Sequence, residues 1–362
     1  MPVPLFDSRT PLAPLRGRIR EAMDRVVDSG SFILGPEVEA FEQEFARYIG
    51  AGHAIGVANG TEAITIALRG LGVGAGDDVV VPSFTYYATA EAIPPTGARP
   101  VFCDVDPETF CVTAETVRAV LTPATKAVIA VHLFGNVAPV GDIAALGVPV
   151  VEDAAQAVGS DSPAGRPGAL GTIATFSFYP SKNLGAFGDG GAVTTSDAAL
   201  ADRVRVLRFH GSRDKVTYEQ VGYNSRLDAL QAAILRVLLP ELDGWAAHRM
   251  LVGEWYAKAG LGDHARLPVA TRDARPAWHL YVIRRERPDE LAAALGTHGI
   301  EARGYYRVPV HRQPAMAALG HDAELPGTDE AARTHLAIPI GSAMTSEQVD
   351  EVVAAIRHAR LG

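Results

Sequence analysis

A single lysine stands among glycines in the segment "FSFYPSKNLGAFGDGGAVTT", residues 176–195. Its first residues alternate between apolar and polar as in a strand, and the alternation ends at Pro180, two residues before Lys182. Only four of the 33 lysine and arginine residues are lysines, so the chain uses arginine wherever it needs a generic positive charge. A lysine can lose its proton at ordinary pH and act as a nucleophile, whereas a guanidinium stays charged. Lys182 is therefore a candidate nucleophile, and a solvated surface charge is the equally weighted alternative.

Other residues that could do chemistry follow the predicted strands at 53–58 and 78–82. In an open α/β sheet, a ligand sits beyond the carboxyl ends of the strands. Gly60 and Thr61 open a helix after the first strand, where exposed N–H groups and a hydroxyl form either an anion site or an ordinary helix cap. Tyr86 follows the second strand, where its ring would cover a flat ligand or simply pack.

A carboxylate ends the predicted strand at 148–154. Asp153 lies at this strand end and Gln156 lies three residues further on. An acid here binds a metal, a ribose or a protonated ring nitrogen, or it caps a helix. Together with the anion site, the aromatic ring and Lys182, it meets the needs of one cofactor, pyridoxal phosphate. The phosphate of that cofactor needs donors, its ring nitrogen needs a carboxylate, and its aldehyde needs an amine.

The elements that would position these residues form a regular alternation. Short apolar runs separated by helical patterns occur at 53–58, 78–82, 99–105, 127–134 and 148–154. This alternation predicts an α/β domain with a mostly parallel central sheet flanked by helices. The runs at 172–178 and 191–196 follow each other with no helix between them, so at least one strand of the sheet should be antiparallel.

Helical patterns precede and follow this alternation. They occur at 12–29, at 37–49 and at 225–261, where Pro240 interrupts the last of them. Beyond Pro268, the run "HLYVIR", a helix at 289–298, the stretch "EARGYYRVPV" and two terminal helices predict a small α+β domain. We therefore expect a large α/β domain at 12–245 and a small domain at 246–362, with an N-terminal arm at 1–11.

Composition excludes several classes of function. With 362 residues and 48% hydrophobic content, the chain can bury a large core. A net charge of −9 and the lack of a basic run argue against a nucleic-acid or membrane surface. No apolar stretch has the length of a signal peptide or a membrane span, which predicts a cytoplasmic protein. Cys103 and Cys111 are too few for a disulfide framework or a metal site, so we interpret both as packing residues and predict no metal.

Seven segments in order resemble one protein family along nearly the whole chain. They are "NGTEAITIALRGLGVGAGDDVVVPSFTYYATAEAI", "GARPVFCDVD", "VHLFG", "VEDAAQAVGS", "FSFYPSKNLGAFGDGGAVTT", "HGSRDKVTYEQVGYNSRLDALQAAIL" and "YYRVPVHRQPAM". They are similar to the DegT/DnrJ/EryC1/StrS family of sugar aminotransferases, which are fold-type I pyridoxal-phosphate enzymes. By that resemblance, Lys182 bonds the cofactor's aldehyde, Asp153 pairs with the ring nitrogen, Gln156 contacts the hydroxyl side of the ring, and Tyr86 stacks on it.

The resemblance also implies how the phosphate and the substrate are held. Ser177 would bind the phosphate together with Gly60 and Thr61, and Asn224 would reach it from a partner subunit, so that a homodimer shares its active sites. The segment "SGSFILGPEVEAFE" resembles the family's N-terminal substrate loop. The substrate contacts that follow are Ser31, Phe32, Arg226 of the partner chain, Tyr305, Tyr306 and His311. For His311, a structural role after a proline is at least as well supported.

The reaction that the resemblance implies is a transamination. L-glutamate would be the amino donor, and the freed Lys182, its pKa lowered by burial, would move the proton from the donor's Cα. The acceptor would be a nucleotide-linked 3- or 4-keto sugar, giving an aminosugar for an antibiotic or a surface polysaccharide. One alternative is a sugar dehydratase of the same fold, which has a histidine in place of the lysine or an iron–sulfur partner domain. The other is a regulatory relative without catalysis, which would have no need to keep the whole constellation.

Overall fold

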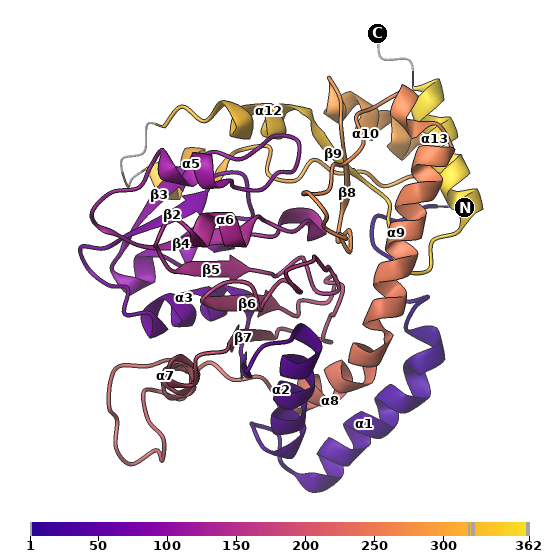
Figure 1. The fold of residues 1–362 in the computed structure, drawn as a ribbon. Helices are drawn as coiled ribbons and strands as arrows, with labels where there is room; N and C mark the ends of the chain where they lie inside the picture. The colour runs from indigo at the N-terminus through magenta and orange to yellow at the C-terminus, as the bar shows by residue number, and fades with distance from the viewer. Residues whose placement is uncertain (1, 318, 320–322, 360–362) are drawn as a thin grey trace.

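A seven-stranded sheet forms the centre of the computed structural model, which describes residues 2–317, 319 and 323–359 (Figure 1). The strands lie in the order β1-β7-β6-β5-β4-β2-β3. Their bounds are His53–Val57 (β1), Asp78–Pro82 (β2), Arg99–Cys103 (β3), Thr125–Val131 (β4), Val150–Asp153 (β5), Ile173–Ser177 (β6) and Gly191–Thr195 (β7). A second, two-stranded sheet pairs β8 (Tyr281–Arg284) with β9 (His335–Ile338).

The direction of the strands confirms the prediction from the sequence. Strands β2 to β6 run parallel to one another, while β7 runs antiparallel to both β1 and β6. The antiparallel member is the strand that follows β6 without a helix between them. Because the sheet is covered on both faces, its strands are apolar almost throughout, as is usual for parallel sheets.

Thirteen α-helices are found among the described residues. The first seven are α1 (Arg16–Ser29), α2 (Pro36–Ile49), α3 (Gly60–Gly70), α4 (Ala88–Glu91), α5 (Ala114–Arg118), α6 (Val140–Ala144) and α7 (Ala198–Arg208). The others are α8 (Ala229–Leu238), α9 (Leu242–Lys258), α10 (Pro288–Thr297), α11 (Pro314–Ala317), α12 (Pro326–Thr334) and α13 (Ser346–His358). In the part of the chain that the structure describes, none of them is long and apolar enough to cross a membrane.

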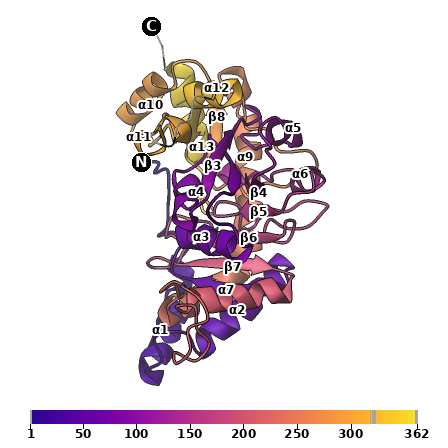
Figure 2. The same cartoon turned by 90° about the vertical axis from the view of Figure 1, so that its left-hand side faces the viewer.

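Two apolar clusters lie on opposite faces of the sheet around β6 and β7. Helix α3 packs on β6 and β7, while α2 lies against β1 and packs with α1 and α8 at the lower end of the molecule (Figures 1 and 2). Residues of β6 alternate between these clusters, with Ile173 on the α3 side and Phe176 on the α2 side. The ring of Phe176 meets that of Phe45 edge-on at 4.9 Å between centroids. The alternation fixes which strand-end side chains face the ligand side.

A third apolar cluster surrounds the small sheet. It gathers β8, β9, α10 and α13, and helix α9 contributes Val252 and Tyr256. The N-terminal arm joins it through Val3, which pairs with Ile300. The chain then returns to the large sheet, where the amide of Val310 donates to the carbonyl of Ser83 at 2.9 Å. This return brings residues 303–310 to the carboxyl edge of the sheet.

A buried carboxylate stabilises the carboxyl end of β5 through hydrogen bonds. Glu152 is fully buried and accepts a hydrogen bond from Nε2 of His132 at 2.8 Å. It also accepts from the backbone amides of Gly168 at 2.8 Å, Leu170 at 2.8 Å and Gly171 at 2.6 Å. Because Nδ1 of His132 accepts from the amide of Ala138 at 3.0 Å, its proton sits on Nε2 and points at the carboxylate. Four donors therefore satisfy one buried charge next to Asp153.

We predict that Glu152→Gln lowers the free energy of unfolding by about 3 kcal/mol, because an amide accepts with one atom only and leaves buried donors unpaired. The matched control is Glu44→Gln, which breaks a half-exposed pair with Arg236 at 2.8 Å and should cost at most about 1 kcal/mol. Guanidinium unfolding of both variants measures the difference. Equal losses would show that the buried carboxylate does not anchor this edge.

Candidate active site

A cavity of about 1220 Å³ opens at the carboxyl ends of the parallel strands. The residues around it come from the ends of β4, β5 and β6, from the start of α3, from the segment after β2, and from residues 303–308. Nine of the residues predicted from the sequence line it: Gly60, Thr61, Tyr86, Asp153, Gln156, Ser177, Lys182, Tyr305 and Tyr306. The structure thus brings together groups that lie up to about 250 residues apart in the chain.

Lys182 lies in the connection between β6 and β7. Its amide donates to the carbonyl of Tyr179 at 2.8 Å, which closes a tight turn. Gly185 permits this turn, since a Cβ there would lie 2.6 Å from the carbonyl oxygen of Pro180. Burial lowers the pKa of Lys182 from 10.5 to about 8, and the negative charge of Asp153 opposes that shift. At neutral pH the amine is therefore much closer to its nucleophilic form than an exposed lysine.

Asp153 is 6% exposed and faces the same cavity. Its Oδ2 accepts from the hydroxyl of Thr89 at 2.8 Å, and its Oδ1 accepts from the amide of Ala155 at 3.2 Å. The backbone carbonyl of Asp153 accepts from the amide of His132 at 3.0 Å, which completes the pairing of the strand end. These bonds fix the plane of the carboxylate while leaving it room to accept another donor from the cavity.

Gln156 and the aromatic residues form one connected wall. The side-chain oxygen of Gln156 accepts from the amide of Phe134 at 2.8 Å, and its nitrogen donates to the hydroxyl of Tyr306 at 3.1 Å. The ring of Tyr306 stacks on that of Phe134, with centroids 6.0 Å apart and planes 5° from parallel. Tyr86, 58% exposed, lies 6.2 Å from Tyr306 between ring centroids. The wall offers ring faces and one amide to a flat ligand.

The start of α3 forms the predicted anion site. Asn59 caps the helix by accepting from the amide of Glu62 at 2.9 Å. The amides of Gly60 and Thr61 come first in the helix, where there is no carbonyl one turn earlier to accept from them. A Cβ on Gly60 would lie 2.7 Å from the Cβ of Ser177, so only glycine allows this close approach. The helix dipole adds positive potential at the same place.

These groups fit pyridoxal phosphate. The helix start and Ser177 offer donors to a phosphate, the carboxylate of Asp153 can hold a protonated ring nitrogen, and the amine of Lys182 can bond an aldehyde. Among the described residues, no group of three or more His, Cys, Asp or Glu side chains could hold a metal ion.

Four predicted residues lie outside this cavity. Ser31 and Phe32 stand before α2, where the carbonyl of Phe32 accepts from the amide of Ala229 at 2.9 Å. Asn224 pairs with Phe209, and Nη1 of Arg226 lies 3.2 Å from Nε2 of His210. Phe32 is 47% exposed. The substrate contacts predicted for Ser31 and Phe32, and the cross-subunit roles predicted for Asn224 and Arg226, stay predictions.

His311 also lies away from the cavity lining. It is 3% exposed, and its Nδ1 lies 2.5 Å from the hydroxyl of Ser83. The amide of His311 donates back to the same hydroxyl at 3.2 Å. Burial and these bonds favour the structural role over the substrate contact, which stays a prediction.

Thr89, His279 and Arg303 are among the polar residues of the cavity lining that sequence reasoning missed. Thr89 bonds Asp153, His279 is buried with an unpaired Nδ1, and Arg303 exposes its guanidinium. Burial and the charges of Lys182 and Arg249 hold the pKa of His279 well below its usual range, so its ring is neutral. The only sequence signal was position, since Thr89 follows a strand and His279 precedes "LYVIR".

The fold and the cavity together define a fold-type I pyridoxal-phosphate enzyme. A model of the DegT/DnrJ/EryC1/StrS aminotransferase family matches residues 15–357. The chain belongs to this family and is a pyridoxal-phosphate-dependent sugar aminotransferase.

Three similar proteins illustrate the range of the family. The dTDP-3-amino-3,4,6-trideoxy-α-D-glucose transaminase of Streptomyces venezuelae is 44% identical over 98% of this chain and 96% of its own. A pleiotropic regulatory protein of Geobacillus stearothermophilus is 43% identical over 98% and 97%. The crystal structure of DesV from S. venezuelae, in complex with a ketimine intermediate, covers 100% of this chain and 99% of its own, with 43% identity and a TM-score of 0.96.

The lowered pKa of Lys182 predicts that this residue destabilises the cofactor-free protein. The folded state resists the charged amine, so the penalty is fully present below about pH 8 and disappears as the pH rises toward 10.5. We expect Lys182→Met to raise the free energy of unfolding by up to about 3 kcal/mol at pH 7, with a smaller gain at pH 10.

The matched control is Lys258→Met, because Lys258 is 73% exposed and lies in α9. It should change stability by no more than about 0.5 kcal/mol at either pH. Denaturant unfolding of the cofactor-free proteins gives these values. A Lys182→Met variant no more stable than wild type at pH 7 would contradict a desolvated amine.

Proposed function

We propose that this protein transfers an amino group from L-glutamate to a nucleotide-linked keto-sugar. The amino acid becomes its 2-oxo acid and the sugar ketone becomes an amine, so the exchange balances without an oxidant or reductant. The observation that carries the proposal is the amine of Lys182, with its pKa of about 8, in one cavity with the carboxylate of Asp153. The size of the cavity, about 1220 Å³, supports a ligand larger than the cofactor alone.

Different residues of this chain carry out different parts of the proposed reaction. Bound pyridoxal phosphate supplies a conjugated ring that accepts the electrons released when the donor's Cα loses its proton. Lys182 takes that proton through Nζ, because an amine with a pKa of about 8 is partly neutral near pH 7. Asp153 holds the ring nitrogen as a cation by charge. Tyr86, Gln156 and the start of α3 orient the ring and the phosphate.

The relatives support a 3-keto sugar carried by dTDP as the first substrate to test. The S. venezuelae relative is named for a 3-amino dTDP sugar. Arg303, exposed at the cavity wall, offers a cation to the nucleotide's phosphates. A product of this kind serves antibiotic or surface-polysaccharide biosynthesis.

Lys182 counts against the dehydratase alternative, which needs a histidine in its place or an iron–sulfur partner domain. The regulatory alternative has two relatives with regulatory or sensory names, a pleiotropic regulatory protein and a sensory transduction protein of erythromycin biosynthesis. A regulatory protein, however, would have no use for a desolvated amine beside a fixed carboxylate. Catalysis is therefore the proposal that the site supports best.

We predict that purified protein with pyridoxal phosphate, L-glutamate and a dTDP-linked 3-keto sugar forms 2-oxoglutarate and aminosugar in equal amounts. Lys182→Ala should remove both the product and the visible absorbance of the bound cofactor while the fold survives. Asp153→Asn should lower turnover by about 100-fold or more, because an amide cannot hold the ring nitrogen as a cation. Mass spectrometry and absorbance measure these outcomes. Turnover by the Lys182→Ala variant would exclude the assigned role of this lysine.

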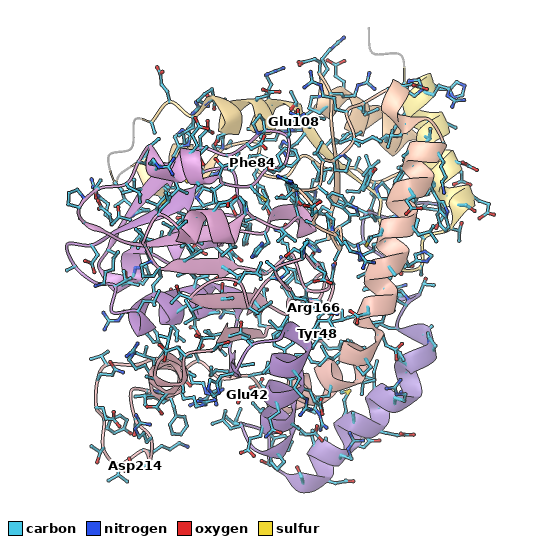
Figure 3. The ribbon with its side chains drawn as sticks, viewed as in Figure 1. Glu42, Tyr48, Phe84, Glu108, Arg166 and Asp214 are labelled. Atoms are coloured by element: carbon cyan, nitrogen blue, oxygen red, sulfur yellow. The ribbon has the colours of Figure 1, made fainter. Side chains whose placement is uncertain are left out.

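We further propose a homodimer whose active sites combine residues of two chains. Asn224 and Arg226 lie outside the cavity of their own chain. They directly follow the segment 211–222, which projects from the rest of the molecule (Figure 3, near Asp214). That segment exposes Val216 at 81% and Val221 at 84%, which is unfavourable unless another surface covers them. A second copy related by a two-fold axis would cover both segments and complete both sites.

Mixed dimers test the shared site. We predict that an inactive Lys182→Ala chain, refolded together with an inactive chain carrying Asn224→Ala and Arg226→Ala, recovers about a quarter or more of the wild-type activity per mixed dimer. One site of the mixed dimer then has an intact lysine from one chain and intact Asn224 and Arg226 from the other. Native mass spectrometry verifies that mixed dimers form. Mixed dimers without activity would contradict shared sites.

A further inference from the structure

Two buried hydroxyls form a chain of hydrogen bonds that ends at the carboxylate of Asp153. The hydroxyl of Thr89 lies 2.8 Å from Oδ2 of Asp153, and the hydroxyl of Thr85 lies 3.1 Å from that of Thr89. Each threonine is 1% exposed, and both border the cavity. The amide of Thr89 donates to the carbonyl of Tyr86 at 3.1 Å, which fixes the turn that holds both hydroxyls.

The direction of this chain of hydrogen bonds follows from proton counting. A hydroxyl has one proton to donate, and an ionised carboxylate only accepts. Thr89 therefore donates its proton to Asp153, and Thr85 must donate to the oxygen of Thr89. A hydroxyl that accepts one hydrogen bond donates a stronger one, so Thr85 polarises the bond that Thr89 makes.

We propose that Thr89, polarised by Thr85, is a positioning residue that keeps the carboxylate of Asp153 oriented toward the cofactor's ring nitrogen. This inference rests on the proposed function of the site. A carboxylate stabilises a protonated ring nitrogen only when one of its oxygens faces that nitrogen, so the orientation of Asp153 matters for the chemistry. With Thr89 on Oδ2 and the amide of Ala155 on Oδ1, the carboxylate has little freedom to rotate.

The short segment 85–89 thereby determines two of the proposed contacts to the ring of the cofactor. Tyr86, proposed to stack on the ring, lies between Thr85 and Thr89 in the sequence and lines the same cavity. A displacement of this segment would move the stacking ring and the hydroxyl that orients the carboxylate together. The segment begins directly after Phe84, a fully buried residue whose ring lies 5.5 Å from that of Phe110. The core therefore anchors the segment that orients the site.

The test compares cofactor-loaded wild type with Thr89→Val, Thr89→Ser, Thr85→Val and the double valine variant. Valine matches threonine in shape, so Thr89→Val removes the hydroxyl while filling the same space. We expect Thr89→Val to lower kcat by about 10- to 100-fold, in line with the loss of a hydrogen bond to a charged group. KM for L-glutamate should change by less than about threefold, because Thr89 does not contact the donor. Thr89→Ser should restore kcat to within about threefold of wild type.

A spectroscopic readout separates positioning from mere packing. In Thr89→Val, the pH midpoint of the visible cofactor band should move upward by about 0.5 unit or more. The reason is that a ring nitrogen held less firmly as a cation repels the proton on the lysine nitrogen less. Thr85→Val should lower kcat by only about two- to fivefold, since Thr89 still donates. The double variant should be no worse than Thr89→Val to within about twofold, because Thr85 acts only through Thr89.

Three results would overturn the inference. In the first, Thr89→Val keeps the wild-type band midpoint and kcat, even if its melting temperature falls, so that the hydroxyl only supports packing. In the second, the effects of the two valine substitutions multiply, which excludes a relay. In the third, Thr89→Ser is as impaired as Thr89→Val. A wild-type protein that forms no visible band with pyridoxal phosphate would instead refute the proposed function, and this inference with it.

Discussion

The site depends on one energetic conflict, the partly buried amine of Lys182 at the end of a parallel sheet. Burial lowers the pKa of Lys182 to about 8, and the charge of Asp153 limits the shift. Without burial the lysine would be a protonated surface charge, and without the carboxylate the buried cation would be costlier still. The strand ends and the connection between β6 and β7 hold these two groups in one cavity.

The central sheet places Lys182 and Asp153 in one cavity because the carboxyl ends of its parallel strands lie at one edge. Strands β4, β5 and β6 run parallel, so their carboxyl ends meet at one edge, where Asp153 and Ser177 stand. The reversal at β7 then makes the chain turn back along the same edge, and Lys182 lies in that turn. Glu152, which accepts hydrogen bonds from four donors, holds this edge in place next to Asp153.

Much of this arrangement could be predicted from the sequence. The apolar runs predicted the strands, and the lack of a helix before the run at 191–196 predicted the antiparallel strand. The rule that ligands bind beyond the carboxyl ends of strands predicted Asp153 and Tyr86 as site residues. Thr89 could not be found this way, because a threonine in a short helix carries no local sign of the carboxylate 64 residues away. The pairing of His132 with Glu152 could not be predicted for the same reason, since His132 directly follows β4 and Glu152 lies in β5, 20 residues later. Asn224 and Arg226 lie outside the cavity of their own chain, and the roles predicted for them involve a partner subunit. Ser31 and Phe32 also lie outside the cavity, and the substrate contacts predicted for them stay predictions.

The most direct measurement of the central claim is to reduce the cofactor-loaded protein with borohydride, digest it and map the modified lysine by mass spectrometry. Reduction makes the bond between a lysine and the cofactor permanent. Four lysines compete, and we expect a phosphopyridoxyl group on Lys182 alone, at close to one per chain. Modification of Lys126, Lys215 or Lys258 in place of Lys182, or no modified peptide at all, would contradict it.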